Sequence, residues 1–235
     1  MAAIPALNTY AALPANNALV ALKRFNPGLY ALQQTYASNY KQLSEYADMQ
    51  GFRDPIENLA TVVHELIHID SASHQGYLIE GTHYAPYLTP AAWPTLNNST
   101  LTAAITPTDI TALGPIYRQY ILNAPNNTIA NELDEINAYT QTIPFICANA
   151  PHQTAQHLRA LTGHIALVDI YLRTLARSFT NQYHQLTRNQ TSRGALETII
   201  ANGYTALNTC YRAGILEADP RPIPKSSTQA FAATK

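Results

Sequence analysis

Charged side chains and long apolar runs are both scarce in this sequence. Asp, Glu, Lys and Arg make up only 12% of the 235 residues, against about 25% in ordinary soluble proteins. The formal net charge of -1 argues against the basic surface that binds nucleic acid. No apolar run approaches the ~20 residues of a membrane-spanning helix. We therefore expect neither a nucleic-acid partner nor a membrane span, and the composition indicates a soluble, folded protein.

The start of the chain also lacks the basic segment and the continuous apolar segment of a signal peptide. A secreted or exported protein whose leader had been removed would look the same, so the compartment stays open. Cysteine is scarce too, with only Cys147 and Cys210. We favour two buried thiols over a disulfide, which would require an oxidising compartment.

No internal repeat and no clear linker divides the chain, which predicts a single domain over residues 1–218 and an extended or disordered tail over 219–235. The spacing of apolar residues predicts helices over 15–49 (broken near 26–28), 55–71, 108–122, 128–147, 153–186 and 191–215. Residues 76–88, "GYLIEGTHYAPYL", predict a short strand or hairpin edge, and residues 89–107 a loop. The expected fold class is mainly α with a small β-sheet (α+β).

The predicted helix from Pro55 begins with strong signals. Asp54 suits the N-cap, Pro55 the first helical position, and Glu57 is placed to reach back in a capping box. The helix then carries His64, Glu65 and His68 in the pattern H-E-x-x-H.

On a helix, His64 and His68 lie one turn apart and face the same way, so both imidazoles can bind one cation. Glu65 lies about 100° around the helix, where it can take a proton from a metal-bound water without binding the metal. Buried polar side chains need partners, and the apolar neighbours of this motif place it in the core. The pattern predicts a metal site rather than two satisfied core histidines.

These residues resemble the active-site helix of the zincin metallopeptidases. The resemblance implies a Zn²⁺ ion, a water activated by Glu65, a zincin-like fold and a peptide or protein substrate. It covers the motif helix and, more loosely, residues 55–145.

The third zinc ligand has several candidates in the sequence. His74 occupies the third histidine position of the metzincin pattern, but Ser71 replaces its glycine, and Met1 and Met49 both precede the motif, so no Met-turn follows it. Residues 81–87, "GTHYAPY", resemble the G-T-x-D-x-x-Y signature of the aspzincins, except that Tyr84 replaces the ligand Asp. His83 and the neighbouring Glu80 are the alternatives that this segment offers.

The gluzincins offer the best match for the third ligand. In that family a second helix donates a Glu, often followed three residues later by a small residue. Glu135 and Ala138 have this spacing, so we predict Glu135 as the ligand, with Glu132 as the alternative. The prediction requires the 128–147 helix to pack against the motif helix with Ala138 at the contact.

The remaining roles rest on weaker signals. Tyr84 and Tyr87 are our candidates for donating a hydrogen bond to the oxyanion of the transition state, ahead of Tyr77 and Tyr139. Asp70 and Asp134 are candidate acceptors for a ligand imidazole. His157 and His164 are expected to be solvated or satisfied rather than catalytic.

The sequence therefore predicts a zinc metallopeptidase. Two alternatives remain open: a zinc amidase acting on cell-wall or other amides, and a non-catalytic metal-binding protein. The last would need a fourth protein ligand, such as His74 or His83 together with a carboxylate. The substrate and the oligomeric state are not determined by these patterns.

Overall fold

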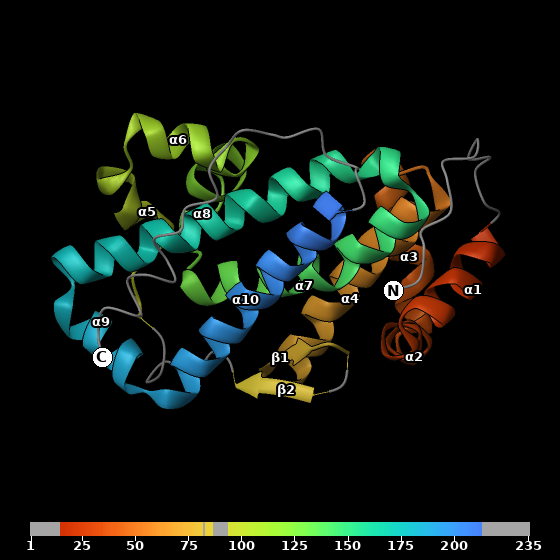
Figure 1. Cartoon of the computed structure of the whole chain (residues 1–235), viewed down its shortest axis with the longest axis horizontal. Helices are drawn as coiled ribbons and strands as arrows, with labels where there is room; N and C mark the ends of the chain where they lie inside the picture. The colour runs from red at the N-terminus through yellow and green to blue at the C-terminus, as the bar shows by residue number, and fades with distance from the viewer. Residues whose placement is uncertain (1–14, 82, 87–93, 213–235) are drawn as a thin grey trace.

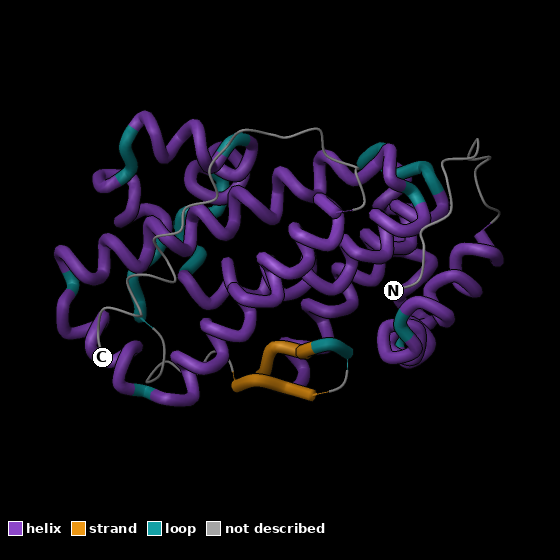
Figure 2. Tube along the Cα trace, viewed as in Figure 1, coloured by secondary structure: helices purple, strands orange, loops and turns teal. Residues whose placement is uncertain are grey.

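The computed structural model describes residues 15–81, 83–86 and 94–212. This part of the chain is mainly helical, with a single small antiparallel sheet (Figures 1 and 2). The predicted mainly α class with a small sheet is confirmed. The predicted tail, 219–235, lies outside the described residues. None of the described helices combines the length and the apolar character that crossing a membrane requires.

The first predicted helix is three helices, α1 (Ala15–Phe25), α2 (Pro27–Thr35) and α3 (Ala37–Met49). The expected break falls at Asn26, whose side chain accepts a hydrogen bond from the Leu29 amide at 3.1 Å and caps α2. A second break follows at Tyr36, which is both the C-cap of α2 and the N-cap of α3.

The motif helix is α4 (Pro55–His74). The Asp54 carboxylate caps it by accepting from the amides of Ile56 and Glu57, at 2.9 and 3.2 Å. The predicted capping box is absent, because the Glu57 carboxylate pairs with His157 instead, at 3.1 Å. The helix also runs one turn beyond Ser71 to His74, and Gln75 caps its end in a left-handed conformation (φ 50°).

The hairpin predicted after α4 is present. Strand β1 (Gly76–Ile79) pairs antiparallel with β2 (His83–Pro86) in a register that places Ile79 opposite His83. Glu80 and Gly81 make the turn with positive φ. The turn lies against the start of α2, where a Cβ at Gly28 would come within 2.8 Å of the Gly81 carbonyl oxygen.

The chain between the hairpin and α7 departs from the prediction. Residues 94–107 include α5 (Asn98–Leu101) and the 3-10 helix η1 (Thr102–Ala104), which the predicted loop did not contain. The predicted 108–122 helix is α6 (Pro107–Leu113) followed by η2 (Tyr117–Leu122), a turn of π-helix. Gly114 separates them with a positive φ of 55°.

Three long helices, one short helix and one 3-10 turn complete the described part of the fold. They are α7 (Ile129–Asn149), η3 (Pro151–Gln153), α8 (Thr154–Ser178), α9 (Thr180–Arg188) and α10 (Gln190–Arg212). The predicted 153–186 helix is thus divided at Phe179. Helix α7 is central: it packs against α4, α8 and α10 (Figure 1).

Two hydrophobic clusters meet along α7. One joins α7 to α8 and α10 and contains the predicted apolar stripe of α8, with Leu158, Leu161 and Ile165 buried. The other joins α7 to α1, α2 and α4, and Ala138 is fully buried in it. Because α7 contributes to both clusters, its position relative to α4 is fixed from two sides.

The two cysteines correct the prediction of free thiols. Cys147, near the end of α7, and Cys210, near the end of α10, form a disulfide. Both are buried, as expected. The pairing results from the packing of α7 on α10, which brings together two residues 63 positions apart in the sequence.

Candidate metal centre

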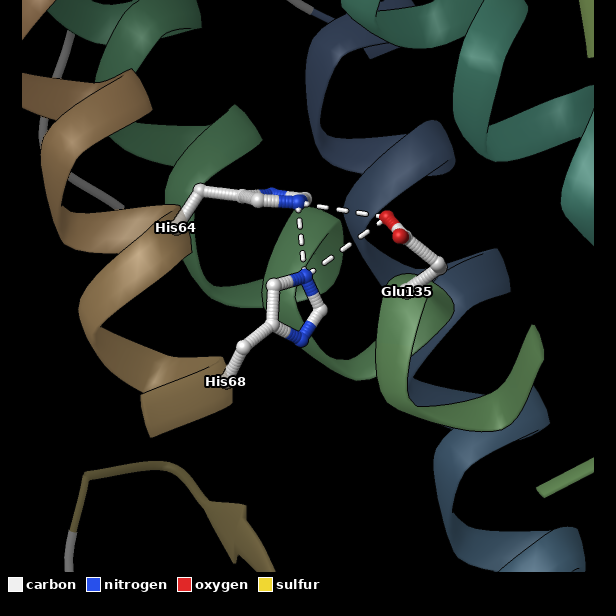
Figure 3. Close-up of side chains that lie close together, drawn as sticks. All are labelled: His64, His68 and Glu135. Carbon is white, nitrogen blue, oxygen red and sulfur yellow. Dashed lines mark hydrogen bonds and ion pairs between the residues drawn. The ribbon is translucent and has the colours of Figure 1, made fainter. Parts of the chain in front are cut away.

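His64 and His68 lie on the face of α4 that packs against α7 (Figure 3). Their rings meet edge to face, with centroids 4.7 Å apart. The two Nε2 atoms point toward each other at 3.1 Å. One helical turn separates the residues, so this convergence follows from their i, i+4 spacing.

Helix α7 brings Glu135 to the two histidines. Its Oε2 atom lies 3.3 Å from His64 Nε2 and 3.6 Å from His68 Nε2 (Figure 3). Ala138, three residues later, is buried against the apolar side chains of α4. The helix contact that the Glu135 prediction requires is therefore present, and Glu135 is the acidic residue that the fold brings to this pair.

The spacing of these three atoms fits a small tetrahedral cation. Zinc binds His nitrogen and carboxylate oxygen at about 2.0–2.2 Å, which places neighbouring ligand atoms about 3.3–3.6 Å apart at tetrahedral angles. The observed separations are 3.1, 3.3 and 3.6 Å. Among the residues that the structure describes, no second group of three His, Cys, Asp or Glu side chains converges in this way.

Asp134 fixes the orientation of His68. Its Oδ2 atom lies 2.7 Å from His68 Nδ1, so this nitrogen carries the proton and Nε2 faces His64 and Glu135. Of the two predicted carboxylate acceptors, Asp134 thus contacts the imidazole of a candidate ligand, His68. Asp70 does not, because it accepts hydrogen bonds from Tyr36 and Tyr84 at 2.8 and 2.6 Å.

The charges in the cluster shift each other's pKa. Burial acts to lower the pKa of His68, but Asp134 and Glu135 outweigh it and hold the pKa well above its usual value. Burial likewise acts to raise the pKa of Glu135, and the hydrogen bonds with His64 and His68 outweigh it and hold the pKa well below its usual value. The contacts in the cluster thus favour the ionised form of the Glu135 carboxylate. A cation bound between these atoms would also require this carboxylate to be ionised.

Glu65 lines a cavity of about 130 Å³ beside this cluster. The walls of the cavity come from α4, α7, α8, the π-turn and the segment before α4: Phe52, Ala60, Thr61, His64, Glu65, Tyr120, Glu135, Tyr139, Thr142 and His157. Glu65 is half-buried and does not belong to the group of three converging ligand atoms. It lies beside the cluster, where the sequence pattern predicts a proton acceptor rather than a ligand.

Of the candidate oxyanion donors, Tyr139 lines this cavity, whereas Tyr84 and Tyr77 have partners elsewhere. The Tyr84 hydroxyl donates to Asp70, and its ring stacks on His74 with centroids 4.4 Å apart. Burial and Asp70 raise the pKa of Tyr84 to about 12. Tyr77 is buried and donates to the Ala130 carbonyl. Tyr87 lies outside the described residues.

The alternative third ligands also lie elsewhere. His74 contacts the carbonyl and the carboxylate of Asp70. His83 and Glu80 are exposed, on β2 and in the hairpin turn. Glu132 is fully buried, and its Oε2 pairs with His164 Nδ1 at 2.9 Å. These groups are engaged or exposed, so among the described residues the cluster that could hold a cation consists of His64, His68 and Glu135.

In the sequence, Tyr120 and Glu57 carried no signal of a role near the centre, and Tyr139, His157 and His164 carried a weak one. Tyr120 reaches the cluster from a π-turn, and Glu57 reaches His157 from the first turn of α4. Tyr139, one turn after Glu135, lies edge-on to the His64 ring with centroids 4.4 Å apart. His157 Nε2 and His164 Nδ1 pair with Glu57 and Glu132, whereas the buried His164 Nε2 has no hydrogen-bond partner among the described residues. His157 also lines the cavity, which only the packing of α8 reveals.

Comparisons of this chain with protein-family models, with curated proteins and with solved structures found no match.

Proposed function

We propose that this protein is a zinc-dependent hydrolase of peptide bonds, with His64, His68 and Glu135 as the metal ligands. The observation that carries the proposal is the convergence of three ligand atoms from an H-E-x-x-H helix and its neighbour, at separations of 3.1 to 3.6 Å. The pairing of Asp134 with His68 adds the carboxylate–imidazole contact typical of metal sites.

Zinc in such a site supplies Lewis acidity, which polarises a substrate carbonyl and acidifies water. The chain's own contribution is to hold and transfer protons. Glu65 lines the same cavity as His64 and Glu135, which supports a role for its carboxylate in accepting a proton from attacking water and delivering it to the leaving amine. This division of roles requires that Glu65 does not bind the metal.

An enzyme is favoured over a purely structural metal site by the ligand count. Structural zinc sites use four protein ligands, whereas catalytic sites use three and keep one position open. The described residues bring three ligands together, and a cavity adjoins them.

The size of the cavity bears on the substrate. At about 130 Å³ it is smaller than the roughly 300–1,000 Å³ of pockets that enclose whole small ligands. Only the groups around the scissile bond fit inside, so we propose a peptide or protein substrate that extends beyond the cavity. The disulfide between Cys147 and Cys210 supports an oxidising compartment, such as the outside of the cell.

The proposal is tested by Glu65→Gln. We expect the variant to bind zinc like the wild type but to lose about 10²-fold or more in hydrolysis, measured on the best substrate from a peptide library. Glu197→Gln, which changes an exposed carboxylate on α10, is the matched control and should keep full activity. Loss of zinc from Glu65→Gln would show that Glu65 is a ligand, and equal activity in both variants would remove its proposed role.

A further inference from the structure

The two oxygens of the Glu135 carboxylate have different partners. Oε2 faces His64 and His68, at 3.3 and 3.6 Å. Oε1 accepts a hydrogen bond from the Tyr120 hydroxyl at 2.9 Å. A carboxylate can bind a metal through one oxygen or through both, so the partner of the second oxygen decides how many coordination positions the residue occupies.

Tyr120 owes its place to an unusual piece of backbone. It lies in the π-helical turn η2, and the preceding α6 ends at Gly114, which has a positive φ. The fully buried Asn98 holds this turn by donating from Nδ2 to the Tyr120 carbonyl at 2.8 Å. Single π-turns are rare and occur often at functional sites.

The ring of Tyr120 is also held in place. It lies edge-on to the His164 ring, with centroids 4.4 Å apart and an interplanar angle of 83°. His164 Nδ1 pairs with Glu132 Oε2 at 2.9 Å, and both side chains are 0% exposed. A rigid, buried neighbour restricts the rotation of the Tyr120 ring, so the hydroxyl stays directed at Glu135.

The hydroxyl remains a donor under ordinary conditions. A phenol is protonated at neutral pH, and the protonated hydroxyl donates its hydrogen bond to Glu135 Oε1. A hydrogen bond from a neutral donor to a carboxylate is charge-assisted and stronger than one between neutral groups. Oε1 therefore has a lasting partner on the side away from the histidines.

We propose that Tyr120 is a positioning residue that restricts Glu135 to binding the metal through Oε2 alone. This inference rests on the proposed zinc site. A second oxygen on the metal would occupy the position that catalysis needs for water and substrate. By holding Oε1, Tyr120 keeps this position open and also fixes the orientation of the ligand.

The test is Tyr120→Phe, which removes the hydroxyl and keeps the ring against His164. Tyr117→Phe is the matched control, because it removes the same atom from the same π-turn at a half-buried residue packed on the core. Zn²⁺ affinity is measured by competition with a chelator. The visible absorption of the Co²⁺-loaded protein gives a second readout, because four-coordinate Co²⁺ absorbs much more strongly than five-coordinate Co²⁺.

We expect Tyr120→Phe to weaken zinc binding by about 10- to 100-fold, as for other residues that support metal ligands. Its Co²⁺ bands should also weaken, because Glu135 then binds through both oxygens. Tyr117→Phe should match the wild type in both readouts. Weaker affinity with unchanged Co²⁺ bands would overturn the one-oxygen assignment, and so would equal affinity and equal bands in the two variants. A wild-type protein that binds neither metal would refute the proposed zinc function itself.

Discussion

At the scale of single residues, two of the three proposed ligands have a second polar partner behind them. His68 is held by Asp134 and Glu135 by Tyr120. Such partners fix the ligand atoms in place before a cation binds, which lowers the entropy cost of forming the site. The candidate ligands that proved to lie elsewhere, such as His74 and Glu132, have partners of their own that turn them away from this cluster.

A titration of ligand variants tests this arrangement. The wild type should carry about one equivalent of zinc, and His64→Ala and His68→Ala should lose it. Glu135→Ala should weaken zinc binding by two to three decades, about 3–4 kcal/mol, because a charged ligand is lost. Elemental analysis and a chelator competition measure both quantities.

The controls for this series are His74→Ala and His83→Ala. His74 is engaged with Asp70, and His83 is exposed on β2, so both variants should retain zinc. Zinc that disappears with either of these changes, while Glu135→Ala stays loaded, would contradict the assignment of the third ligand.

At the scale of elements, the centre depends on helices whose ends and contacts are fixed by polar groups. Helix α6 is an example that lies away from the candidate metal centre. Thr106 and Asp109 form a reciprocal capping box at its start. Asp109 Oδ1 also accepts from the Arg173 guanidinium of α8 at 2.7 Å, which ties α6 to α8. Asp109 therefore links a local cap to a tertiary contact.

Asp109 should make the stability of the protein depend on pH. Burial acts to raise the pKa of Asp109, but the hydrogen bonds from Thr106 and Arg173 outweigh it and lower the pKa. A lowered folded-state pKa stabilises the fold above the unfolded value near ~3.9, and this contribution is lost as the pH falls through the folded value. We expect Asp109→Asn to reduce the free energy of unfolding at pH 7 by about 1–3 kcal/mol, measured by urea denaturation.

The difference between Asp109→Asn and the wild type should shrink below pH ~4, where the wild-type carboxylate also becomes protonated. Glu197→Gln is the control, because Glu197 pairs with Arg193 on the surface at 3.5 Å and such pairs contribute little. A constant difference from pH 7 to pH 3 would mean that packing, rather than charge, explains the effect of the substitution.

At the scale of the whole molecule, the disulfide covalently links two long helices of the fold. It joins α7, which carries Glu135, to α10 across 63 residues. Cross-linking a loop of this length restricts the unfolded chain and stabilises the fold by about 4 kcal/mol in the chain-entropy treatment. The bond lies at the far end of α7 from Glu135, so it acts on global stability rather than on the ligand geometry.

The Cys147→Ala/Cys210→Ala double variant should therefore unfold at lower urea, with a loss of about 2–4 kcal/mol in the free energy of unfolding. Its zinc affinity, measured under native conditions, should stay within a few-fold of the wild type. Wild-type protein treated with a reductant should lose stability to a similar extent. A large loss of zinc affinity in the native double variant would show that the bond also shapes the metal centre.

Local patterns in the sequence were enough to predict several features of the fold and the site. The Asp54 cap and Pro55 predicted where α4 begins, and the apolar spacing predicted the stripe on α8. The i, i+4 spacing of His64 and His68 predicted that their rings converge. These features involve residues within one or two helical turns, where backbone geometry alone fixes the neighbours. The spacing of Glu135 and Ala138 favoured one helix contact over several alternatives, because a small residue permits close packing.

Tertiary structure decided the features that depend on which elements meet. The spacing of apolar residues did not predict the end of α4 beyond Ser71, the division of the 153–186 helix or the turn of π-helix. The cysteines pair because the fold brings together two residues that are 63 positions apart. The Tyr84 hydroxyl reaches Asp70 because the hairpin folds back toward the end of α4. Tyr120 is 15 residues before Glu135, with no periodicity to link them. A hydrogen bond between separate elements depends on how those elements are oriented, and orientation is set by the burial of the whole core.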